Sequence, residues 1–501
     1  MNELYTLSAG QLAARVRTRE LSPVALVEAH IERLEAVNPR INALAAGRFE
    51  RARAEARAAE RELARGDDCP PLLGVPCTIK SFLAVAEMPH HAGLVARRDV
   101  VARADSAVVA RLRAAGAIVI GLGSVPEGGM WIETVNRLVG RTDNPWDVSR
   151  TPGGSSGGEA ALIAAGAAPF ALGSDIGGSI RIPAAFCGLA GHKPSGGLVP
   201  NTGHWGAERG QNRYLCIGPL ARRVSDLSLI LGLIAGPDGV DVGADAALDR
   251  EVRAGLGGDL GPGRLDGVTV YPLERVGDVA ITPVMAAQVE RVSAALRARG
   301  AIIARPDPER LRGLGKTWLA AMYDLGRANQ TPSFATLLGD GDTISPAREL
   351  LRLAAHKLIG GRGADTSSHF TAPALGLAAL EQLVSALPTA ALSRLPRPRA
   401  LRAALEAELG PDGVYVLPPY PRPAPRHGEA LLRPFEFLCT ALCNITELPA
   451  TQVPTGFDIN GLPVGVQIAA RHGNDALALR VAAAVEQDFG SSWRPAPVPP
   501  G

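Results

Sequence analysis

Residues 152–183 contain two clusters of glycine and serine whose composition is typical of a reaction centre. The first cluster is the run GGSSGG at 153–158, and the second is GGS at 177–179. Glycines beside a serine let the backbone turn sharply and leave the hydroxyl and nearby N–H groups open to a ligand. A serine can attack a carbonyl carbon while successive N–H groups stabilise the resulting oxyanion. The pattern therefore favours nucleophilic acyl transfer.

Three other interpretations fit this stretch less well. A flexible linker would be polar throughout, whereas here the clusters enclose a long run of apolar residues. A phosphate-binding loop would need a P-loop ending or GxGxxG, and neither is present. Residues 153–157 also match the GxSxG elbow of α/β-hydrolases, but that motif follows a strand, and residues 143–152 are turn-forming. A Ser-His-Asp triad stays an alternative, although His192 is more typical of a structural residue.

Lysine is rare in this chain and indicates a possible base. Of 52 basic residues only four are lysine: Lys80, Lys193, Lys316 and Lys357. A buried lysine can lose its proton, whereas a guanidinium is effectively always charged. Lys80 ends the apolar run GVPCTIK (74–80), so we expect its amine at the tip of a buried strand. Lys316 and Lys357 are more simply interpreted as surface residues.

Three motifs in order give the chain a resemblance to a known family. GVPCTIK, PGGSSGGEAAL and GSDIGGSIRIPAAFCGLAGHKPS resemble the motifs of the amidase signature family, and the likeness extends over most of the chain. Within that family, GMWIETVN, DIGGSIR and GHKPSGGLVPNTGHW look closest to the fatty-acid-amide hydrolase branch. The resemblance implies hydrolysis of a carboxylic amide through an acyl-enzyme, by a Ser-cisSer-Lys triad.

The resemblance also assigns catalytic roles to individual residues. Ser179 matches the acylated nucleophile, Ser155 the bridging serine and Lys80 the base, and the Gly154–Ser155 peptide is expected to be cis. A lysine base near neutrality needs a pKa roughly three units below its usual value near 10.4. Burial can supply such a shift, because it disfavours the charged form.

The oxyanion hole and the cofactor requirement follow from the same resemblance. The backbone N–H groups of Ile176, Gly177, Gly178 and Ser179 correspond to the oxyanion hole. The chemistry requires no metal and no organic cofactor. One departure concerns the position after the base, where family members usually have an acidic residue and this chain has Ser81. Electrostatic help from that position is therefore in question.

Composition is typical of a cytoplasmic globular protein. The chain has 501 residues, of which 46% are apolar, and a net charge of +2, which indicates neither nucleic acid nor an anionic membrane as a partner. The six cysteines show no disulfide framework, and we expect Cys439 and Cys443 to be core residues. The longest apolar run, 160–173, is shorter than the roughly 20 residues that span a bilayer, so no transmembrane segment is expected.

The pattern of short β-branched runs after helices predicts an α/β fold. A helix that ends at a glycine precedes the strand-like run 117–121, and the same sequence of elements recurs before 301–304, with a further strand at 268–271. Residues 8–66 are expected to be helical throughout. Together with the family resemblance, this predicts a large mixed central β-sheet covered by helices.

We expect one domain built from three parts. Residues 1–66 form the N-terminal helical part, 67–235 and 428–490 the catalytic core, and 236–427 a variable segment that shapes the substrate channel. Candidates from the variable segment to line that channel, if they are not simply core, are Trp318, Met322, Tyr323, Phe334 and Phe370.

The substrate is expected to be a small-molecule amide with an apolar, fatty or aryl group. Met130 and Trp131 lie where family members line the substrate pocket, and Asp175 and Arg181 are expected to hold the nucleophile loop rather than touch substrate. The alternative within acyl chemistry is a glutamine-hydrolysing subunit of an amidotransferase, which needs partner subunits. A non-catalytic binding protein is disfavoured because all three triad positions are filled. We allow for a homodimer.

Overall fold

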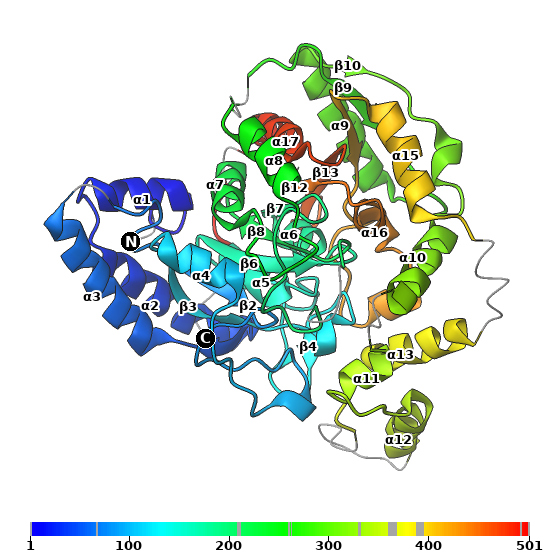
Figure 1. Cartoon of the computed structure of the whole chain (residues 1–501), viewed down its shortest axis with the longest axis horizontal. Helices are drawn as coiled ribbons and strands as arrows, with labels where there is room; N and C mark the ends of the chain where they lie inside the picture. The colour runs from blue at the N-terminus through cyan, green and yellow to red at the C-terminus, as the bar shows by residue number, and fades with distance from the viewer. Residues whose placement is uncertain are drawn as a thin grey trace.

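An eleven-stranded mixed β-sheet forms the centre of the protein (Figure 1). The computed structural model describes residues 3–66, 69–207, 212–258, 261, 263–328, 332–358, 368–386, 395–490 and 493–498. The strand order is β1-β3-β2-β6-β8-β7-β12-β13-β11-β9-β10. The predicted large mixed sheet of an α/β fold is therefore confirmed.

The sheet combines parallel and antiparallel pairs. Strand β2 lies between β3 and β6 and is parallel to both, and β9 lies between β11 and β10 and is parallel to both. The neighbouring pairs from β6 through β8, β7, β12 and β13 to β11 are antiparallel. The strands are β1 (Leu44–Gly47), β2 (Pro76–Lys80), β3 (Ile118–Gly123), β6 (Phe170–Asp175), β7 (Ala190–Lys193), β8 (Cys216–Ala221), β9 (Thr269–Pro272), β10 (Ile302–Ile303), β11 (Gly413–Leu417), β12 (Ala450–Phe457) and β13 (Pro463–Ala470). A separate hairpin is formed by β4 (Val135–Asn136) and β5 (Gly140–Arg141).

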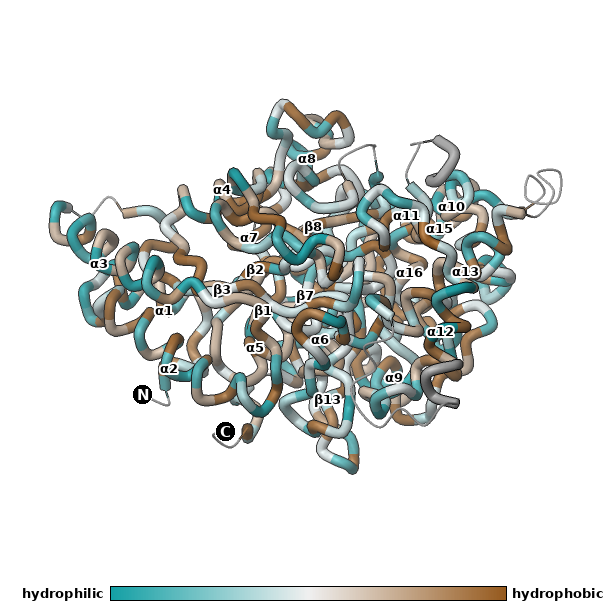
Figure 2. The backbone as a smooth tube through the Cα atoms, turned by 90° about the horizontal axis from the view of Figure 1, so that it is seen from below, coloured by the Kyte–Doolittle hydropathy of each residue, from teal (hydrophilic) through white to brown (hydrophobic). Residues whose placement is uncertain are grey.

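Helices cover both faces of the sheet. Figure 2 shows α4, α7 and α8 on one side of the strands β1 to β3 and α2 and α5 on the other. The helices are α1 (Ala9–Arg17), α2 (Pro23–Ile41), α3 (Phe49–Arg65), α4 (Ala107–Ala114), α5 (Gly157–Ala164), α6 (Arg181–Cys187), α7 (Val224–Ile234), α8 (Ala246–Leu256), α9 (Pro283–Ala298), α10 (Leu314–Ala328), α11 (Phe334–Leu338), α12 (Pro346–Leu358), α13 (Ala372–Ser385), α15 (Pro398–Leu409), α16 (Leu438–Ile445) and α17 (Asp475–Phe489). Short 3₁₀ helices are η1 (Val95–Arg97), η2 (Glu127–Gly129), η3 (Pro308–Leu311) and η4 (Glu429–Leu432).

Local sequence explains where the first helices begin. Ser8 accepts a hydrogen bond from the Gln11 amide, and the Gln11 side chain bonds back to the Ser8 amide, which completes a capping box. Ser22 caps α2 through its side chain, with Pro23 in the first turn, as the sequence predicts. Both helices then present apolar faces to the core.

The prediction that residues 8–66 are helical throughout is wrong at one strand. Asn42 adopts a left-handed conformation with φ of 46° and ends α2, and β1 then pairs antiparallel with β3 at the sheet edge. Its residues, Leu-Ala-Ala-Gly, have mostly good helix propensity. Hydrogen bonding to the free edge of β3 outweighs that propensity, which sequence-local reasoning does not detect.

The variable segment 236–427 contributes to two different parts of the molecule. The strands β9, β10 and β11 extend the central sheet, and the predicted strands near 268–271 and 301–304 are confirmed. Helices α10 to α13 and α15 instead lie beyond the sheet, on the side opposite α1 to α3 (Figure 1). Lys316 is exposed, as expected, whereas the side chain of Lys357 lies outside the described residues.

Candidate active site

Lys80 is the last residue of β2, where a strand buried along its whole length ends. Its side chain is 1% exposed. The Nζ atom donates to Ser155 Oγ at 2.8 Å and to the carbonyl oxygen of Ser174 at 3.0 Å. The prediction of an amine at the tip of a buried strand is therefore confirmed, and the structure joins Lys80 directly to Ser155.

Ser155 lies in the turn that leads into α5. The Gly154–Ser155 peptide is cis, as the family resemblance implies. The turn is closely packed: Gly153 has a φ of 88°, and a Cβ there would lie 2.7 Å from the Cα of Pro183. A side chain at Gly153 would thus be both strained and obstructed. No strand occurs within 143–152, so the context of a nucleophile elbow is absent from these described residues.

Ser179 lies in the loop that follows β6 and is half-buried. Its carbonyl oxygen accepts a hydrogen bond of 3.1 Å from the Ser156 amide, so the two Gly-Ser clusters are in direct contact. Within the described residues the Ser179 hydroxyl forms no hydrogen bond, and the structure does not join it to Ser155. Catalytic hydrogen bonds are often long or absent before substrate binds.

Asp175 and Arg181 hold the loop that contains Ser179, as expected. The Asp175 carboxylate accepts hydrogen bonds from the amides of Gly178 at 2.7 Å and Ile180 at 3.1 Å. Arg181 donates from Nε and Nη2 to the two carboxylate oxygens, each at 3.0 Å. Both side chains are fully buried. Such a bidentate charged pair fixes geometry as well as adding energy.

Of the four backbone amides predicted to form the oxyanion hole, one already donates a hydrogen bond and three do not. The Gly178 amide donates to Asp175, so in this structure it is not free to stabilise an oxyanion, unlike the expectation for it. In the described part of the chain, the amides of Ile176, Gly177 and Ser179 have no acceptor. Three of the four predicted oxyanion donors are therefore available.

Burial determines the electrostatics of the amine. It lowers the pKa of Lys80 to about 7, against the opposing effect of the Glu159 and Asp175 carboxylates. The Phe82 ring lies 4.9 Å from Nζ. His204 Nε2 is 2.8 Å from the Ser174 hydroxyl, and burial lowers the pKa of this histidine to about 3, so it is neutral near pH 7. At pH 7 about half of the Lys80 amines are therefore uncharged.

A cluster of apolar side chains that includes Phe82 lies next to Lys80. Met130 is 5% exposed and packs in one cluster with Phe82, Trp205, Phe334 and Phe370. A Cβ at Gly129, the residue before Met130, would lie 3.2 Å from the Phe82 ring and 3.5 Å from Ser155 Oγ. Gly129 therefore lies close to both the Phe82 ring of this cluster and Ser155.

Trp131 and a second apolar group also lie near the site. Trp131 is half-buried, and its indole N–H is buried without a hydrogen-bond partner in the described part of the protein. Trp318 and Met322 pack with Phe437, which approaches Gly177. Tyr323 is half-buried.

Sequence reasoning missed Glu159 and Phe437. Glu159 is fully buried in α5, and burial raises its pKa. It is the only charged residue of the run 157–173, and that isolation was a usable signal. Phe437 has no comparable signal, because only the fold places it beside the nucleophile loop.

Other predicted features belong to the structure rather than to the site. His192 is buried and bonds through its two ring nitrogens to Thr451 and Asp475, and Cys439 and Cys443 are buried, as expected. No cluster of metal-binding side chains occurs among the residues that the structure describes.

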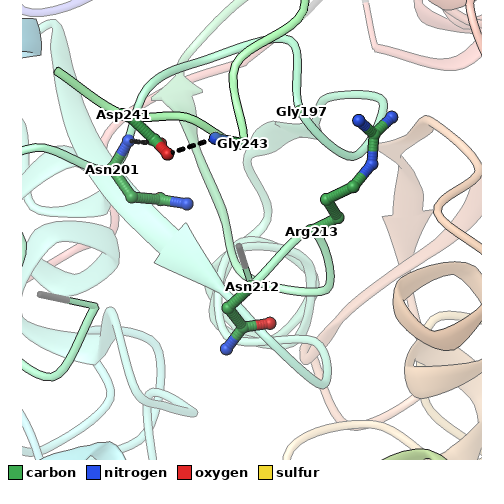
Figure 3. Close-up of a pocket in the computed structure, with 6 residues that line it drawn as sticks. All are labelled: Gly197, Asn201, Asn212, Arg213, Asp241 and Gly243. Atoms are coloured by element: carbon green, nitrogen blue, oxygen red, sulfur yellow. Dashed lines mark hydrogen bonds between the residues drawn. The ribbon is translucent and has the colours of Figure 1, made fainter. Parts of the chain in front are cut away.

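A pocket lies between loops near the start of β8 (Figure 3). Its lining residues are Gly197, Asn201, Asn212, Arg213, Asp241 and Gly243. The Asp241 carboxylate already accepts hydrogen bonds from the amides of Asn201 at 2.7 Å and Gly243 at 2.8 Å. This carboxylate is thus used to hold the loops together, and the pocket contains none of the candidate residues.

Searched over its described helices, the chain shows none that is long and apolar enough to cross a membrane.

Comparison with known proteins identifies the family. The Amidase family matches residues 25–479. Human fatty-acid amide hydrolase 2 is 35% identical over 97% of this chain and 90% of its own length. A glutamyl-tRNA(Gln) amidotransferase component from Anaeromyxobacter sp. (strain K) is 34% identical over 99% of this chain and 98% of its own length. The solved structure of a 6-aminohexanoate cyclic dimer hydrolase with bound substrate superposes with a TM-score of 0.77, at 27% identity over 99% of both chains. The buried amine and serines described above thus belong to a member of the Amidase family, an enzyme that hydrolyses amides.

Proposed function

We propose that Ser179 is the nucleophile of this amidase, Ser155 the bridging serine and Lys80 the base. The observation that supports this most strongly is the 2.8 Å hydrogen bond from a fully buried lysine to Ser155 Oγ. Lysine can act as a base only when neutral, and burial lowers the pKa of Lys80 into the neutral range.

In the acylation step, neutral Lys80 takes the hydroxyl proton of Ser155, and Ser155 takes the proton of Ser179. The Ser179 oxygen then bonds to the amide carbon, and the oxyanion is stabilised by the free amides of Ile176, Gly177 and Ser179. The proton returns along the same route to the amide nitrogen as the C–N bond breaks. Water then hydrolyses the acyl-enzyme and releases the carboxylic acid.

The substrate class that we propose is an amide with an extended apolar acyl or aryl group. The apolar cluster around Met130 includes Phe82, which lies next to Lys80, and Phe437 of the second cluster approaches Gly177, so both clusters offer such a group burial from water. Helices α11 to α13 of the variable segment supply part of the first cluster, which supports a role for residues 236–427 in shaping the channel. The relative named fatty-acid amide hydrolase 2 agrees with this class.

Substrate preference can be tested with Met130→Ala. We expect the variant to lose about tenfold in kcat/KM on a long-chain amide relative to acetamide, because one shortened side chain leaves part of the acyl group unburied. Met285→Ala in α9 is the matched control, since Met285 is also buried but lies in a different helix. Equal rates of the unmodified enzyme on acetamide and long-chain amides would contradict an apolar substrate.

The amidotransferase alternative retains one supporting observation, the 34% identity to a component of a glutamyl-tRNA(Gln) amidotransferase. If it holds, the isolated chain should hydrolyse glutamine weakly and need partner proteins. Hydrolysis of simple apolar amides by the purified chain alone would count against it. We favour the self-sufficient amidase, as a cytoplasmic protein with six free cysteines and as a monomer or homodimer.

The catalytic assignment is tested by intact-protein mass after exposure to a fluorophosphonate. We expect one adduct, which disappears in Ser179→Ala and forms more slowly in Ser155→Ala. Ser149→Ala is the control, because Ser149 is an exposed serine in the turn before the first cluster. An adduct that persists in Ser179→Ala but vanishes in Ser155→Ala would overturn the assignment and point to a catalytic histidine.

A further inference from the structure

Lys80 lies in the sheet between two glycines. In the parallel pairing of β2 and β3, Lys80 is the register partner of Gly123. On the other side Ile79 pairs with Leu172, so the same register places Gly173 beside Lys80. Neighbours in register on parallel strands face the same side of a sheet. The absence of two side chains therefore leaves space next to the amine.

The first turn of α5 fills that space. An ideal Cβ at Gly123 would overlap Glu159 Oε1 and would lie 2.8 Å from the Glu159 backbone nitrogen. A Cβ at Gly173 would lie 2.7 Å from Ser156 Oγ. The helix that follows the bridging serine thus packs a carboxyl group on one side of Lys80 and a hydroxyl group on the other.

Glu159 is buried without the partners that a buried carboxylate normally has. Its exposure is 0%, and within the described residues neither carboxyl oxygen has an ion-pair partner or a hydrogen bond of good geometry; only the backbone N–H groups of Glu159 itself and of Gly123 lie close enough to lower its pKa. Burying a charge is costly unless it is paired or neutralised. The opposite charge that acts on it most strongly is Lys80, which it does not contact directly. A carboxyl group buried in this way can change the pKa of the Lys80 amine through its charge.

We propose that Glu159 is a positioning residue that acts through Lys80, its carboxylate setting how strongly the amine holds its proton. This inference rests on the proposed role of Lys80 as the base. A negative charge favours the protonated amine and opposes the effect of burial. Glu159 would keep Lys80 basic enough to accept the serine proton.

Other charged groups near Lys80 do not change charge in the relevant range. Asp175, at the end of β6, is bound to Arg181, which holds the pKa of that carboxyl below its usual range despite burial. Burial keeps His204 neutral, and it keeps the pKa of His91 below its usual value as well. His90 bonds to the Phe82 carbonyl oxygen. Glu159 is therefore the carboxyl whose removal is expected to move the titration of Lys80.

The test is the pH dependence of fluorophosphonate labelling of Ser179 in Glu159→Gln, which keeps the shape and removes the charge. Loss of the negative charge lowers the pKa of the amine, so the acidic limb of the labelling rate should move to lower pH by about one unit. The maximal rate should fall, because a weaker base accepts the serine proton less readily. A purely structural role would lower the rate at every pH without moving the limb.

Two further variants complete the test. Glu159→Asp keeps the charge and should restore the position of the limb. Glu486→Gln is the matched control: Glu486 also has a pKa raised by burial, but it bonds to the Val224 amide, and its substitution should leave the limb unchanged. An unmoved limb in Glu159→Gln would overturn the inference, and so would a Glu159→Gln protein that does not fold.

Failure of this inference can be told from failure of the proposed base. If Lys80→Ala labels with the same acidic limb as the unmodified enzyme, then Lys80 is not the titrating base and the proposed function fails. If that limb disappears in Lys80→Ala but is unmoved in Glu159→Gln, only the role of Glu159 fails.

Discussion

Two buried pairs of opposite charge, Asp175 with Arg181 and Glu159 with Lys80, lie near Ser155 and Ser179, and they differ in how their charges are bonded. Asp175 and Arg181 are joined by two hydrogen bonds and further held by Asn444 and Gln467. Lys80 instead donates only to neutral oxygens. A charge whose hydrogen bonds are all satisfied keeps its protonation state.

Lys80 and Glu159 form the second pair, and their charges behave in the opposite way. Burial raises the pKa of Glu159 and lowers that of Lys80, so both groups approach the range in which they change charge. For Asp175, burial has the same tendency, but the Arg181 charge and the hydrogen bonds outweigh it and lower the pKa. The comparison teaches that a charge paired by direct hydrogen bonds holds the loop around Ser179 in place, whereas Lys80 and Glu159, which the structure does not join by a hydrogen bond, have pKa values close to neutral pH.

The largest expected effect is on activity in Lys80→Met. Loss of the base should lower kcat/KM by roughly 10³-fold. The free energy of unfolding at pH 8 should change little, because burial already favours the neutral amine. Steady-state kinetics and urea unfolding measure the two quantities. If Lys80→Met lowered the free energy of unfolding as much as Arg181→Met is expected to, the two buried pairs would not differ as described.

Arg181→Met should mainly affect folding. Removing one partner leaves the Asp175 charge buried and unpaired, which costs about 3–5 kcal/mol in the free energy of unfolding. Urea unfolding at pH 7 measures this, with Arg181→Lys as the control that keeps the charge but loses the bidentate geometry. A midpoint equal to that of the unmodified protein would show that the pair does not hold the loop.

The pH dependence of kcat/KM in the unmodified enzyme tests whether Lys80 changes its charge near neutral pH. Lys80 accepts a proton only when neutral, and its pKa is about 7, so kcat/KM should rise from pH 6 to pH 8 and then level off. Below that pKa the slope is about tenfold per pH unit. A flat profile over this range would contradict the assigned base.

The smallest effect on stability is expected from a substitution in an exposed ion pair. Comparing it with the buried pairs tests how much burial matters. Arg264 and Asp266 form an ion pair on the surface, with side chains that are 72% and 61% exposed. Exposed pairs gain little because water screens them. The urea midpoint of Arg264→Ala should equal that of the unmodified protein within error. A measurable loss would show that exposure does not distinguish the two kinds of pair.

Much of the site could be predicted because its signals are local. The apolar run ending in Lys80 predicts a buried amine, and the glycines around Ser155 and Ser179 predict tight turns. The three motifs together predict the family. The short strand β1 was missed, because its pairing with β3 depends on residues about 80 positions away in the chain.

The sequence by itself determined the reaction class, the α/β fold and the residues that meet at the centre. Tertiary structure alone decided which groups are satisfied there. Gly178 has its amide occupied because Asp175 turns toward it, and Glu159 lies beside Lys80 because Gly123 has no side chain. The physical reason is that residue type and spacing specify a group's chemistry, whereas its protonation and free hydrogen bonds depend on burial and on neighbours brought close only by folding.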